Sequence, residues 1–371
     1  MTRVLFIDDE PIVLRSLDRA LRARKVPWEV RFVDSGEAAL QLLSREPFDI
    51  VIADLRIPDL DGVDLLTEVQ RSYPRIARLV LSGQVGTDDC LRAMRVAHQC
   101  LAKPCDVDML RQVVTNLTST RKLLDDGDLA ISANALTCLP SPPRVHIEVC
   151  NAIARNAGLP EIALIIDGDV ALTAKLIQVV NSAFFAQGGG SVTSVQRALS
   201  VLGTDVVRGL LLHIEVFRAF DGADSKRLDE LSRHSKLVAQ IARTLAPREL
   251  AGDAFVAGML HDVGELALMA IGRGAEHPLE HARAGGALLG LWGIGSQIVE
   301  AVAHHHDPGV IPDVRAKLVD TLHVAEVIAG ELTAKPDQPA DVVSLEWLAR
   351  NEPYVLEHAR VVGKEIWGQT P

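Results

Sequence analysis

The stretch DIVIADLRIPDLDG, residues 49–62, decides how the first part of the chain folds. The apolar residues 50–53 run without interruption into Asp54, a pattern typical of a strand buried on both faces of a parallel sheet. The proline, aspartates and glycine that follow favour a turn. We therefore expect a buried strand whose carboxyl end places the Asp54 carboxylate at the edge of a sheet.

Four more short runs of the same character precede and follow this stretch. They are RVLFI (3–7), EVRFV (29–33), ARLVLS (77–82) and HQCLA (98–102). Segments with helical periodicity separate the five runs, which is the pattern of successive βαβ units. The first part of the chain is therefore predicted to be an α/β domain with a doubly wound, parallel, five-stranded sheet.

Beyond residue 118 the strand pattern ends, and amphipathic helical segments follow one another between turn-forming stretches. This pattern predicts a second, all-α domain. The polar segment TSTRKLLDDGD (118–128) is the seam, either as a short linker or as a helix that joins the two cores. The predicted parts are a first domain over 1–120, a linker over 121–130, a helical domain over 131–330 and a C-terminal extension over 331–371, which we expect to be helical and docked on the second domain.

The composition argues against several classes of protein. A formal net charge of -11 disfavours direct binding of nucleic acid, because such binding needs a basic surface. The five cysteines form no Cys-x-x-Cys pair, which favours a reducing compartment. The amino-terminal MTRVLFIDDE lacks a signal-peptide pattern, and no apolar run approaches the roughly 20 residues that span a bilayer. We expect a cytoplasmic protein without a membrane partner.

Polar residues follow four of the five predicted strands. They are Asp8 and Asp9 after the first strand, Asp54 at the end of the third, Ser82 at the end of the fourth and Lys103 after the fifth. Ligands of open parallel sheets bind at the carboxyl ends of the strands, so these side chains are expected on one rim. Crowded carboxylates repel each other, and a hard cation such as Mg²⁺ relieves the repulsion. Such a rim could support phosphoryl transfer to a carboxylate, although aspartate is also a common turn and cap residue after strands.

The motifs on this rim have a family resemblance. FIDDEP (6–11), DIVIADLRIPDLDG (49–62), LVLSG (79–83) and CLAKP (100–104) resemble, in this order, the receiver domain of bacterial two-component response regulators. The resemblance covers the whole first domain and implies a flavodoxin-like receiver that a histidine kinase phosphorylates on Asp54. It further implies that Mg²⁺ is held by Asp9, Asp54 and the backbone carbonyl of Arg56 with support from Asp8, and that Ser82 and Lys103 contact the phosphoryl group.

One position departs from the receiver pattern. Two residues before Ala102, where receivers often carry an aromatic residue that rotates on phosphorylation, this sequence has Cys100. The aromatic half of the usual switch is therefore not expected here, whereas phosphorylation itself is still expected.

Ionisable residues interrupt the apolar stripes of the helical domain. They are His234, His261, Asp262, His281, His305 and Glu326, on five predicted helical segments. Because unpaired buried charges are costly, we expect these groups to meet each other, a metal ion or internal water. Imidazoles with carboxylates suit Zn, Mn or Fe in a one- or two-metal site, and a hydrogen-bonded polar cluster without a metal is the alternative. His304 is expected to be solvated, and the periodicity leaves His306 unassigned.

The helical domain also has a family resemblance. LPSPPRV (139–145), DVALTAKLIQVVNSAFF (169–185), SVQRALSVLG (194–203), GMLHDVGELAL (258–268), HARAGGALLGLWGI (281–294) and AVAHHHDP (301–308) resemble successive landmarks of the HDOD domain. This resemblance covers about residues 130–330 and implies a signalling output module related to the HD phosphohydrolases. The six ionisable residues fall where active HD enzymes place metal ligands, with Glu326 in place of the usual aspartate.

Two departures argue against a cyclic-dinucleotide phosphodiesterase of the HD-GYP type. Glu265 stands where those enzymes carry lysine, and no Gly-Tyr-Pro segment follows HHHDPGVIPD (304–313). The leading hypothesis is therefore a response regulator of a two-component phosphorelay, in which the helical domain acts on an unidentified downstream protein without catalysis. The alternative is a receiver-gated, metal-dependent phosphohydrolase that acts on a nucleotide or phosphodiester.

The resemblances also bear on partners. They imply a cognate histidine kinase and a homodimer formed through the receiver domain. A transcription factor is a third and weaker hypothesis, because the sequence contains no helix-turn-helix pattern and no basic stripe.

Overall fold

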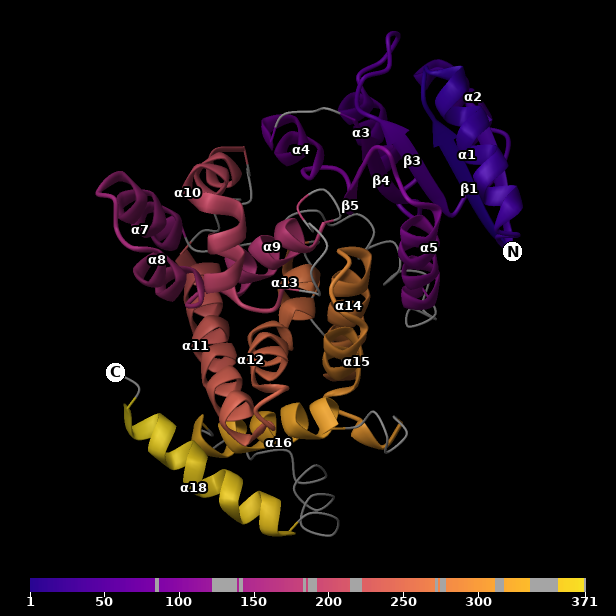
Figure 1. The fold of residues 1–371 in the computed structure, drawn as a ribbon. Coiled ribbons are helices and arrows are strands. Elements are labelled where there is room, and N and C mark those ends of the chain that lie inside the picture. The colour runs from indigo at the N-terminus through magenta and orange to yellow at the C-terminus, as the bar shows by residue number, and fades with distance from the viewer. Residues whose placement is uncertain are drawn as a thin grey trace.

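The computed structural model describes residues 1–83, 87–121, 139, 143–182, 185, 192–213, 222–270, 273, 278–310, 317–333 and 353–369 of the 371-residue chain. A sheet flanked by helices forms the amino-terminal part, and a body of helices forms the remainder (Figure 1). The predicted fold class, a parallel α/β domain followed by a helical domain, is confirmed.

The sheet is built from five parallel strands. They are β1 (Thr2–Ile7), β2 (Trp28–Val33), β3 (Ile50–Asp54), β4 (Ala77–Ser82) and β5 (Gln99–Ala102), in the spatial order β2-β1-β3-β4-β5. The strand order reverses between β1 and β3, which are neighbours in the sheet. Their carboxyl ends therefore lie at the topological switch point, where ligands bind in sheets of this kind.

The helices of the α/β part are α1 (Pro11–Ala23), α2 (Gly36–Leu43), α3 (Gly62–Ser72), α4 (Thr87–Ala93) and α5 (Val107–Arg121). Local side chains fix where two of them begin. The Ser35 hydroxyl accepts a hydrogen bond from the Ala38 N–H at 3.3 Å, and an Asp61 carboxylate oxygen accepts one from the Val63 N–H at 2.8 Å. These caps satisfy backbone donors at the first turns of α2 and α3.

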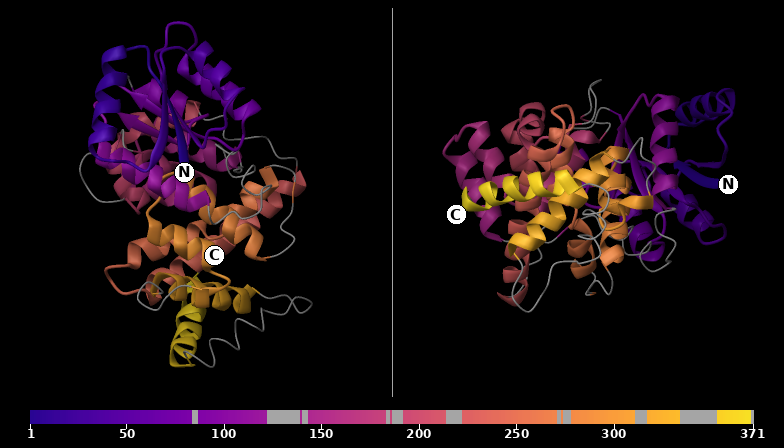
Figure 2. Two further views of the ribbon diagram at one scale, coloured as in Figure 1. Left: turned by 90° about the vertical axis from the view of Figure 1, so that its right-hand side faces the viewer. Right: turned by 90° about the horizontal axis from the view of Figure 1, so that it is seen from below.

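The helical part contains α7 (Pro143–Ala154), α8 (Leu159–Ile166), α9 (Val170–Asn181), α10 (Val195–His213), α11 (Gly222–Leu245), α12 (Ala251–Leu260), α13 (Val263–Ala270), α14 (Pro278–Leu291), α15 (Ser296–His304), α16 (Lys317–Thr333) and α18 (Pro353–Gln369). A short 3-10 helix, η1 (Pro308–Val310), follows α15. Helix α18 packs against α11 and α16, at the end of the molecule away from the sheet (Figures 1 and 2). Helix α5 includes the first residues of the predicted interdomain segment, up to Arg121. Residues 122–130 lie outside the described part of the chain.

The two parts contact each other directly. Helix α14 packs against α5, and α10 packs against α4 (Figure 1). Helix α9 is buried along nearly its whole length, because α10, α12 and α13 pack around it and its side chains reach backbone carbonyls of the α/β part. Among the described residues, every helix is too short or too polar to span a bilayer.

Candidate functional site

Three carboxylates gather at the switch point of the sheet. Asp8 and Asp54 have exposed fractions of only 3% and 7%, and Asp9 is partly exposed beside them. One carboxylate oxygen from each residue lies within 4.8 Å of the others. The strand ends therefore bring together the three acids that the sequence predicted to share one rim, and we call this group the acidic pocket.

Lys103 enters the acidic pocket from the end of β5. Its Nζ atom forms an ion pair with Asp8 Oδ2 at 2.6 Å and a second ion pair with Asp54. Burial alone would lower the pKa of Lys103, but hydrogen bonds to Asp54 and Asp8 outweigh this effect and raise it. The ammonium group therefore stays charged and offsets part of the negative charge of the pocket.

The loop after β3 folds closely around Asp54. The Arg56 N–H donates a hydrogen bond to Asp54 Oδ1 at 3.3 Å, and the Gly62 N–H donates one to the Leu55 carbonyl at 2.9 Å. A Cβ atom on Gly62 would lie 2.1 Å from the Asp54 carbonyl oxygen, so only glycine fits there. The backbone of Asp54 is thereby held in place from the first turn of α3.

The oxygen donors of the acidic pocket suit Mg²⁺, which is usually bound by one or two carboxylates with several waters. Asp9 and Asp54, with Asp8 behind them, offer such a set, and a metal there would relieve the repulsion between them. Ser82 ends β4 with its backbone paired to Ala102. Its side chain lies outside the described part, so its contact with a phosphoryl group stays a prediction, as do the metal-binding roles.

Cys100 occupies the position where receivers often carry an aromatic switch residue. It is fully buried in β5, where it pairs with Val80, and its Sγ atom lies 3.9 Å from the Cys90 carbonyl oxygen. Its interaction with Cys90, together with burial, raises the pKa of the Cys100 thiol. The thiol therefore stays protonated and behaves as a small core residue.

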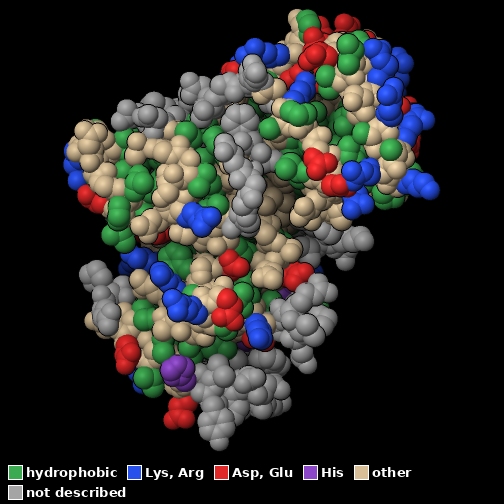
Figure 3. All heavy atoms as spheres, in the orientation of Figure 1, with side chains coloured by type: hydrophobic (Ala, Val, Ile, Leu, Met, Phe, Trp, Pro, Cys, Tyr) green, Lys and Arg blue, Asp and Glu red, His purple; other side chains and the backbone are tan. Residues whose placement is uncertain are grey.

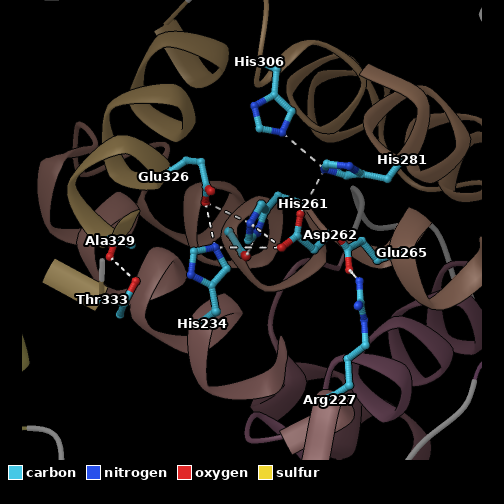
Figure 4. A network of polar contacts seen from close by, with 11 residues as sticks. Arg227, His234, His261, Asp262, Glu265, His281, His306, Glu326, Ala329 and Thr333 are labelled. Carbon is cyan, nitrogen blue, oxygen red and sulfur yellow. Dashed lines mark hydrogen bonds and ion pairs between the residues drawn. The ribbon is translucent and has the colours of Figure 1, made fainter. Parts of the chain in front are cut away.

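A second group of ionisable side chains meets inside the helical part (Figure 4). His234 comes from α11, His261 and Asp262 from the junction of α12 and α13, His281 from α14, His305 from the end of α15, and Glu326 from α16. All six residues that the sequence predicted to point inward are brought together. We call them, with His306, the histidine cluster.

Short contacts join the carboxylates and imidazoles of the histidine cluster. Glu326 Oε2 lies 3.0 Å from the Nε2 atoms of both His234 and His261. Asp262 Oδ2 lies 3.1 Å from His261 Nε2, and Asp262 Oδ1 lies 3.2 Å from His281 Nε2. Glu326 thus bridges two imidazoles, and Asp262, which also lies 3.8 Å from His234 Nε2, contacts three (Figure 4).

Backbone carbonyls orient two of the histidines. His261 Nδ1 lies 2.7 Å from the Gly258 carbonyl oxygen, and His305 Nδ1 lies 2.7 Å from the Val302 carbonyl oxygen. Because a carbonyl only accepts hydrogen bonds, each Nδ1 carries a proton. His261 Nε2 faces oxygens of Asp262 and Glu326 and donates to them. In His305 the neutral ring keeps its lone pair on Nε2. His305 Nε2 is buried and has no hydrogen-bond partner among the described residues. A buried lone pair without a partner is what a metal ligand presents.

Burial and neighbouring charges set the protonation of the histidine cluster. Burial alone would raise the pKa values of Asp262 and Glu326, but the neighbouring histidines outweigh it and hold both well below their usual range. Burial lowers the pKa of His305 well below its usual value, and the neighbouring His306 lowers it further. Burial alone would lower the pKa values of His234, His261 and His281, but neighbouring carboxylates outweigh it and raise them. The cluster therefore contains ionised carboxylates with a neutral His305, and a metal ion would replace protons on the other imidazoles.

His306 joins the cluster although sequence periodicity left it unassigned. Its Nε2 atom lies 3.2 Å from His281 Nε2, and the two ring planes are nearly perpendicular (Figure 4). Helix α15 ends at His304 and its helical backbone conformation extends to the cap residue His305, so helical periodicity no longer applies at His306. His304 itself is partly exposed.

The possible ligand atoms fall into two groups. Nitrogens of His281, His305 and His306 lie within 4.8 Å of one another, and so do single atoms of His234, His261 and Asp262. Imidazole nitrogens with carboxylate oxygens fit Zn, Mn or Fe, in agreement with the sequence-based expectation. The residues present therefore fit a transition metal, whose binding stays a prediction.

The fold and the two sites define the class of protein: a receiver-type α/β domain joined to a helical domain with an HD-like cluster. Three family models agree. Residues 4–115 match the response regulator receiver domain, residues 139–273 match the HDOD domain, and residues 231–343 match the HD domain. The chain therefore joins a region that matches the response regulator receiver model to regions that match the HDOD and HD models.

Curated relatives match part of the chain. The response regulator protein PilR of Pseudomonas aeruginosa is 31% identical over 155 residues, which is 42% of this chain and 34% of the relative. The cell cycle response regulator CtrA of Brucella anthropi is 28% identical over 151 residues, which is 39% of this chain and 64% of the relative. The chain thus spans less than two thirds of the length of these relatives.

Solved structures are similar over a comparable share. A response regulator receiver domain protein from Clostridium thermocellum is 29% identical and covers 33% of this chain and 99% of its own, with a TM-score of 0.31. The signal receiver domain of an HD domain-containing protein from Pseudomonas fluorescens Pf-5 is 28% identical and covers 29% of this chain and 87% of its own, with a TM-score of 0.28.

Proposed function

We propose that this protein is a phosphorylation-dependent response regulator. A cognate histidine kinase supplies the phosphoryl group to Asp54, and the HDOD domain passes the signal to a downstream protein through direct contact. The observation that carries this proposal is the position of Asp54, which is buried, held by its own loop and paired with Lys103 beside Asp8 and Asp9.

Each group of the acidic pocket has a chemical task in this proposal. The Asp54 carboxylate attacks phosphorus, the P–N bond to the phosphorylated histidine of the kinase breaks with imidazole as the leaving group, and an acyl phosphate forms. Lys103 neutralises charge on the phosphoryl oxygens, and Mg²⁺ held by Asp9, Asp54 and the Arg56 carbonyl supplies further positive charge when bound. A phosphoryl group on Asp54 competes with the present ion pair for Lys103, and this competition shifts the receiver between two arrangements.

A phosphodonor experiment tests the proposal. The full chain is incubated with acetyl phosphate and Mg²⁺, and the phosphoryl group is detected by intact-mass measurement. We expect modification of the wild type, none of Asp54→Asn, and wild-type modification of Asp64→Asn, whose exposed carboxylate on α3 is the matched control. Equal modification of Asp54→Asn and the wild type would contradict the proposal.

The proposed location of the protein rests on its cysteines, and the proposed type of partner rests on its surface charge. We place the protein in the cytoplasm, because its described cysteines are free thiols. Direct binding of nucleic acid is not part of the proposal. On the face seen in Figure 3, acidic and basic side chains of the described residues are interspersed, and the net charge is -11. Any control of genes would therefore pass through a protein partner.

A metal-dependent phosphohydrolase is the second candidate function. It is favoured by one specific observation, the buried His305 Nε2 atom without a hydrogen-bond partner among the described residues, in a cluster that also holds Asp262 and Glu326. The ligands would come from two groups: His281, His305 and His306 in one, and His234, His261 and Asp262 with Glu326 beside them in the other. A metal in such a site activates water against a phosphoester.

A substrate screen tests the second candidate. The full chain is supplied with Mn²⁺ and offered nucleotides and phosphodiesters, and released phosphate or nucleotide is measured. We expect turnover that is lost in His261→Ala and kept in His358→Ala, whose histidine is exposed on α18. No turnover of any compound by the metal-loaded wild type would argue against catalysis and leave the first proposal in place.

A further inference from the structure

Helix α14 links the receiver to the histidine cluster. At its carboxyl end, the Gln99 side chain of β5 donates a hydrogen bond from Nε2 to the Leu291 carbonyl oxygen at 3.0 Å. Gln99 has an exposed fraction of 4%, so this contact is shielded from water. Near its amino end, α14 carries His281, which contacts Asp262 and His306. One helix therefore touches the receiver at one end and the cluster at the other.

The turn after α14 is shaped to receive Gln99. Gly293 has a φ of +78°, a left-handed conformation that favours glycine. A Cβ atom on Gly293 would lie 3.0 Å from Gln99 Cδ, closer than side chains normally approach. The Gln99 amide therefore lies against bare backbone, and a shift of β5 would press on or release the end of α14.

Strand β5 connects this contact to the phosphoacceptor. Gln99 begins β5, and Lys103, which pairs with Asp8 and Asp54, comes directly after its last residue. A strand is an extended, hydrogen-bonded element, and β5 is held in register by β4. Lys103 thus lies at one end of β5 and Gln99 at the other. A change in the binding partner of Lys103 therefore acts on the same strand that carries Gln99.

Close backbone packing prevents α14 from moving alone. A Cβ atom on Gly264 of α13 would lie 1.9 Å from the His281 carbonyl oxygen. A Cβ atom on Gly286 of α14 would lie 2.6 Å from Ala303 Cβ of α15. Helix α13 follows Asp262, and α15 precedes His305. Because tightly packed interiors transmit displacement rather than absorb it, movement of α14 displaces the elements that carry these ligands.

We propose that α14 is the element through which the state of Asp54 controls the histidine cluster. Phosphorylation draws Lys103 toward the phosphoryl group, β5 shifts, and Gln99 changes the position of the carboxyl end of α14. His281 then moves relative to Asp262 and His306. This inference rests on the proposed phosphorylation of Asp54 and holds whether the cluster serves catalysis or contact with a partner.

Two other polar contacts between the parts provide a matched control. Gln178 Nε2 donates a hydrogen bond to the His98 carbonyl oxygen at 2.9 Å, and Lys175 Nζ donates one to the Met94 carbonyl oxygen at 3.0 Å. Both donors lie on α9 rather than α14. Gln178→Leu removes a buried hydrogen bond of the same kind as Gln99→Leu, but it leaves the end of α14 untouched.

Hydrogen exchange of the full chain tests the inference. Backbone exchange of α14 and of β4 is measured by mass spectrometry with and without beryllofluoride and Mg²⁺, which mimic the phosphoryl group. In the wild type and in Gln178→Leu, we expect the exchange of both elements to change, by at least about fivefold in α14. In Gln99→Leu, we expect the β4 response to persist and the α14 response to be lost.

The possible outcomes separate the inference from the proposed function. A wild-type response in β4 without one in α14 would overturn the coupling and leave the receiver assignment intact. Loss of the α14 response in both variants, or its persistence in Gln99→Leu, would also overturn it, because the Gln99 contact would then not be the specific link. No response in either element of the wild type would contradict the receiver assignment and the coupling together. The β4 response of each variant also reports that its receiver is folded.

Discussion

The acidic pocket and the histidine cluster both bury carboxylates, but they balance the charge differently. In the pocket, Lys103 supplies a permanent positive charge to Asp8 and Asp54. In the cluster, Asp262 and Glu326 face imidazoles, whose charge depends on bound protons. The pocket therefore has a built-in counter-ion that a phosphoryl group can redirect, whereas the charge of the cluster is completed by protons or by a metal ion.

The two regions also share a structural feature, a glycine that lets two backbone segments approach closely. Gly62 lets the backbone of α3 approach the Asp54 carbonyl, and Gly264 lets α13 approach the His281 carbonyl. In both places a side chain would overlap the backbone of a residue that carries the proposed chemistry. Close backbone packing thus positions the polar groups in two unrelated folds.

The contrast between the acidic pocket and the histidine cluster would fail most clearly if the cluster held no metal. We expect His261→Ala to weaken binding of Zn²⁺ by at least about 100-fold, because it removes a buried nitrogen at the centre of the cluster. His358→Ala, at an exposed position on α18, is the control and should bind as the wild type does. Affinity is measured by competition with a chelator of known strength. Equal affinity in both variants would make the cluster a hydrogen-bonded core without a metal.

A stability measurement sharpens the comparison of the glycines. Gly264→Ala forces overlap with the His281 carbonyl and should lower the free energy of unfolding by about 3 kcal/mol. Gly330→Ala on α16 is the matched control, because a Cβ atom there meets nothing within 4 Å. Alanine is the better helix former, so the control should gain about 0.5–1 kcal/mol. Urea unfolding measures both, and a Gly264→Ala variant as stable as the wild type would contradict the packing argument.

Asp167, at the carboxyl end of α8, shows what happens to a carboxylate without a paired cation. Burial raises its pKa from 3.8 to about 6, and the charges of Lys236 and Arg243 only partly oppose this. The folded state therefore binds the proton more tightly than the unfolded state. The contribution of Asp167 to stability is greatest below pH 3.8 and is lost as the pH rises through about 6.

The smallest expected effect follows from this pH dependence. Asp167→Asn removes the buried charge and should raise the free energy of unfolding at neutral pH by about 1–2 kcal/mol, after allowance for partial exposure. The gain should fall as the pH is lowered from about 6 and vanish below 3.8. Unfolding curves at several pH values measure it, with Asp64→Asn as the exposed control. A gain that is independent of pH would contradict the assigned cause.

The acidic pocket and the histidine cluster could be predicted from the sequence to different extents. The strand ends of the receiver could be predicted because each is local: an apolar run and the polar residue that ends it place Asp54 at the rim. His234, His281, His305 and Glu326 could be predicted because helical periodicity turned them toward the core, and His261 with Asp262 because they interrupt an apolar segment. His306 could not be assigned, because α15 ends at His304 and its helical backbone conformation extends only to the cap residue His305.

The contact between the parts was not predictable from local pattern. Gln99 and Leu291 are far apart in the chain, and their hydrogen bond uses a side-chain amide and a backbone carbonyl. Neither group produces a pattern in the sequence. Every residue has a backbone carbonyl, and a single glutamine in a strand does not indicate which group it will contact. Gly293 gave the nearest clue, because glycine after a helix favours a left-handed turn.

The most direct test of the link between the two regions is the Zn²⁺ affinity of the full chain at constant Mg²⁺, measured with and without beryllofluoride. If the receiver and the histidine cluster form one switch, the affinity should change by at least about fivefold, and Zn²⁺ should change the affinity for beryllofluoride by the same factor. The Asp54→Asn variant should show neither change. An identical Zn²⁺ affinity in both conditions would contradict the coupling of Asp54 to the cluster.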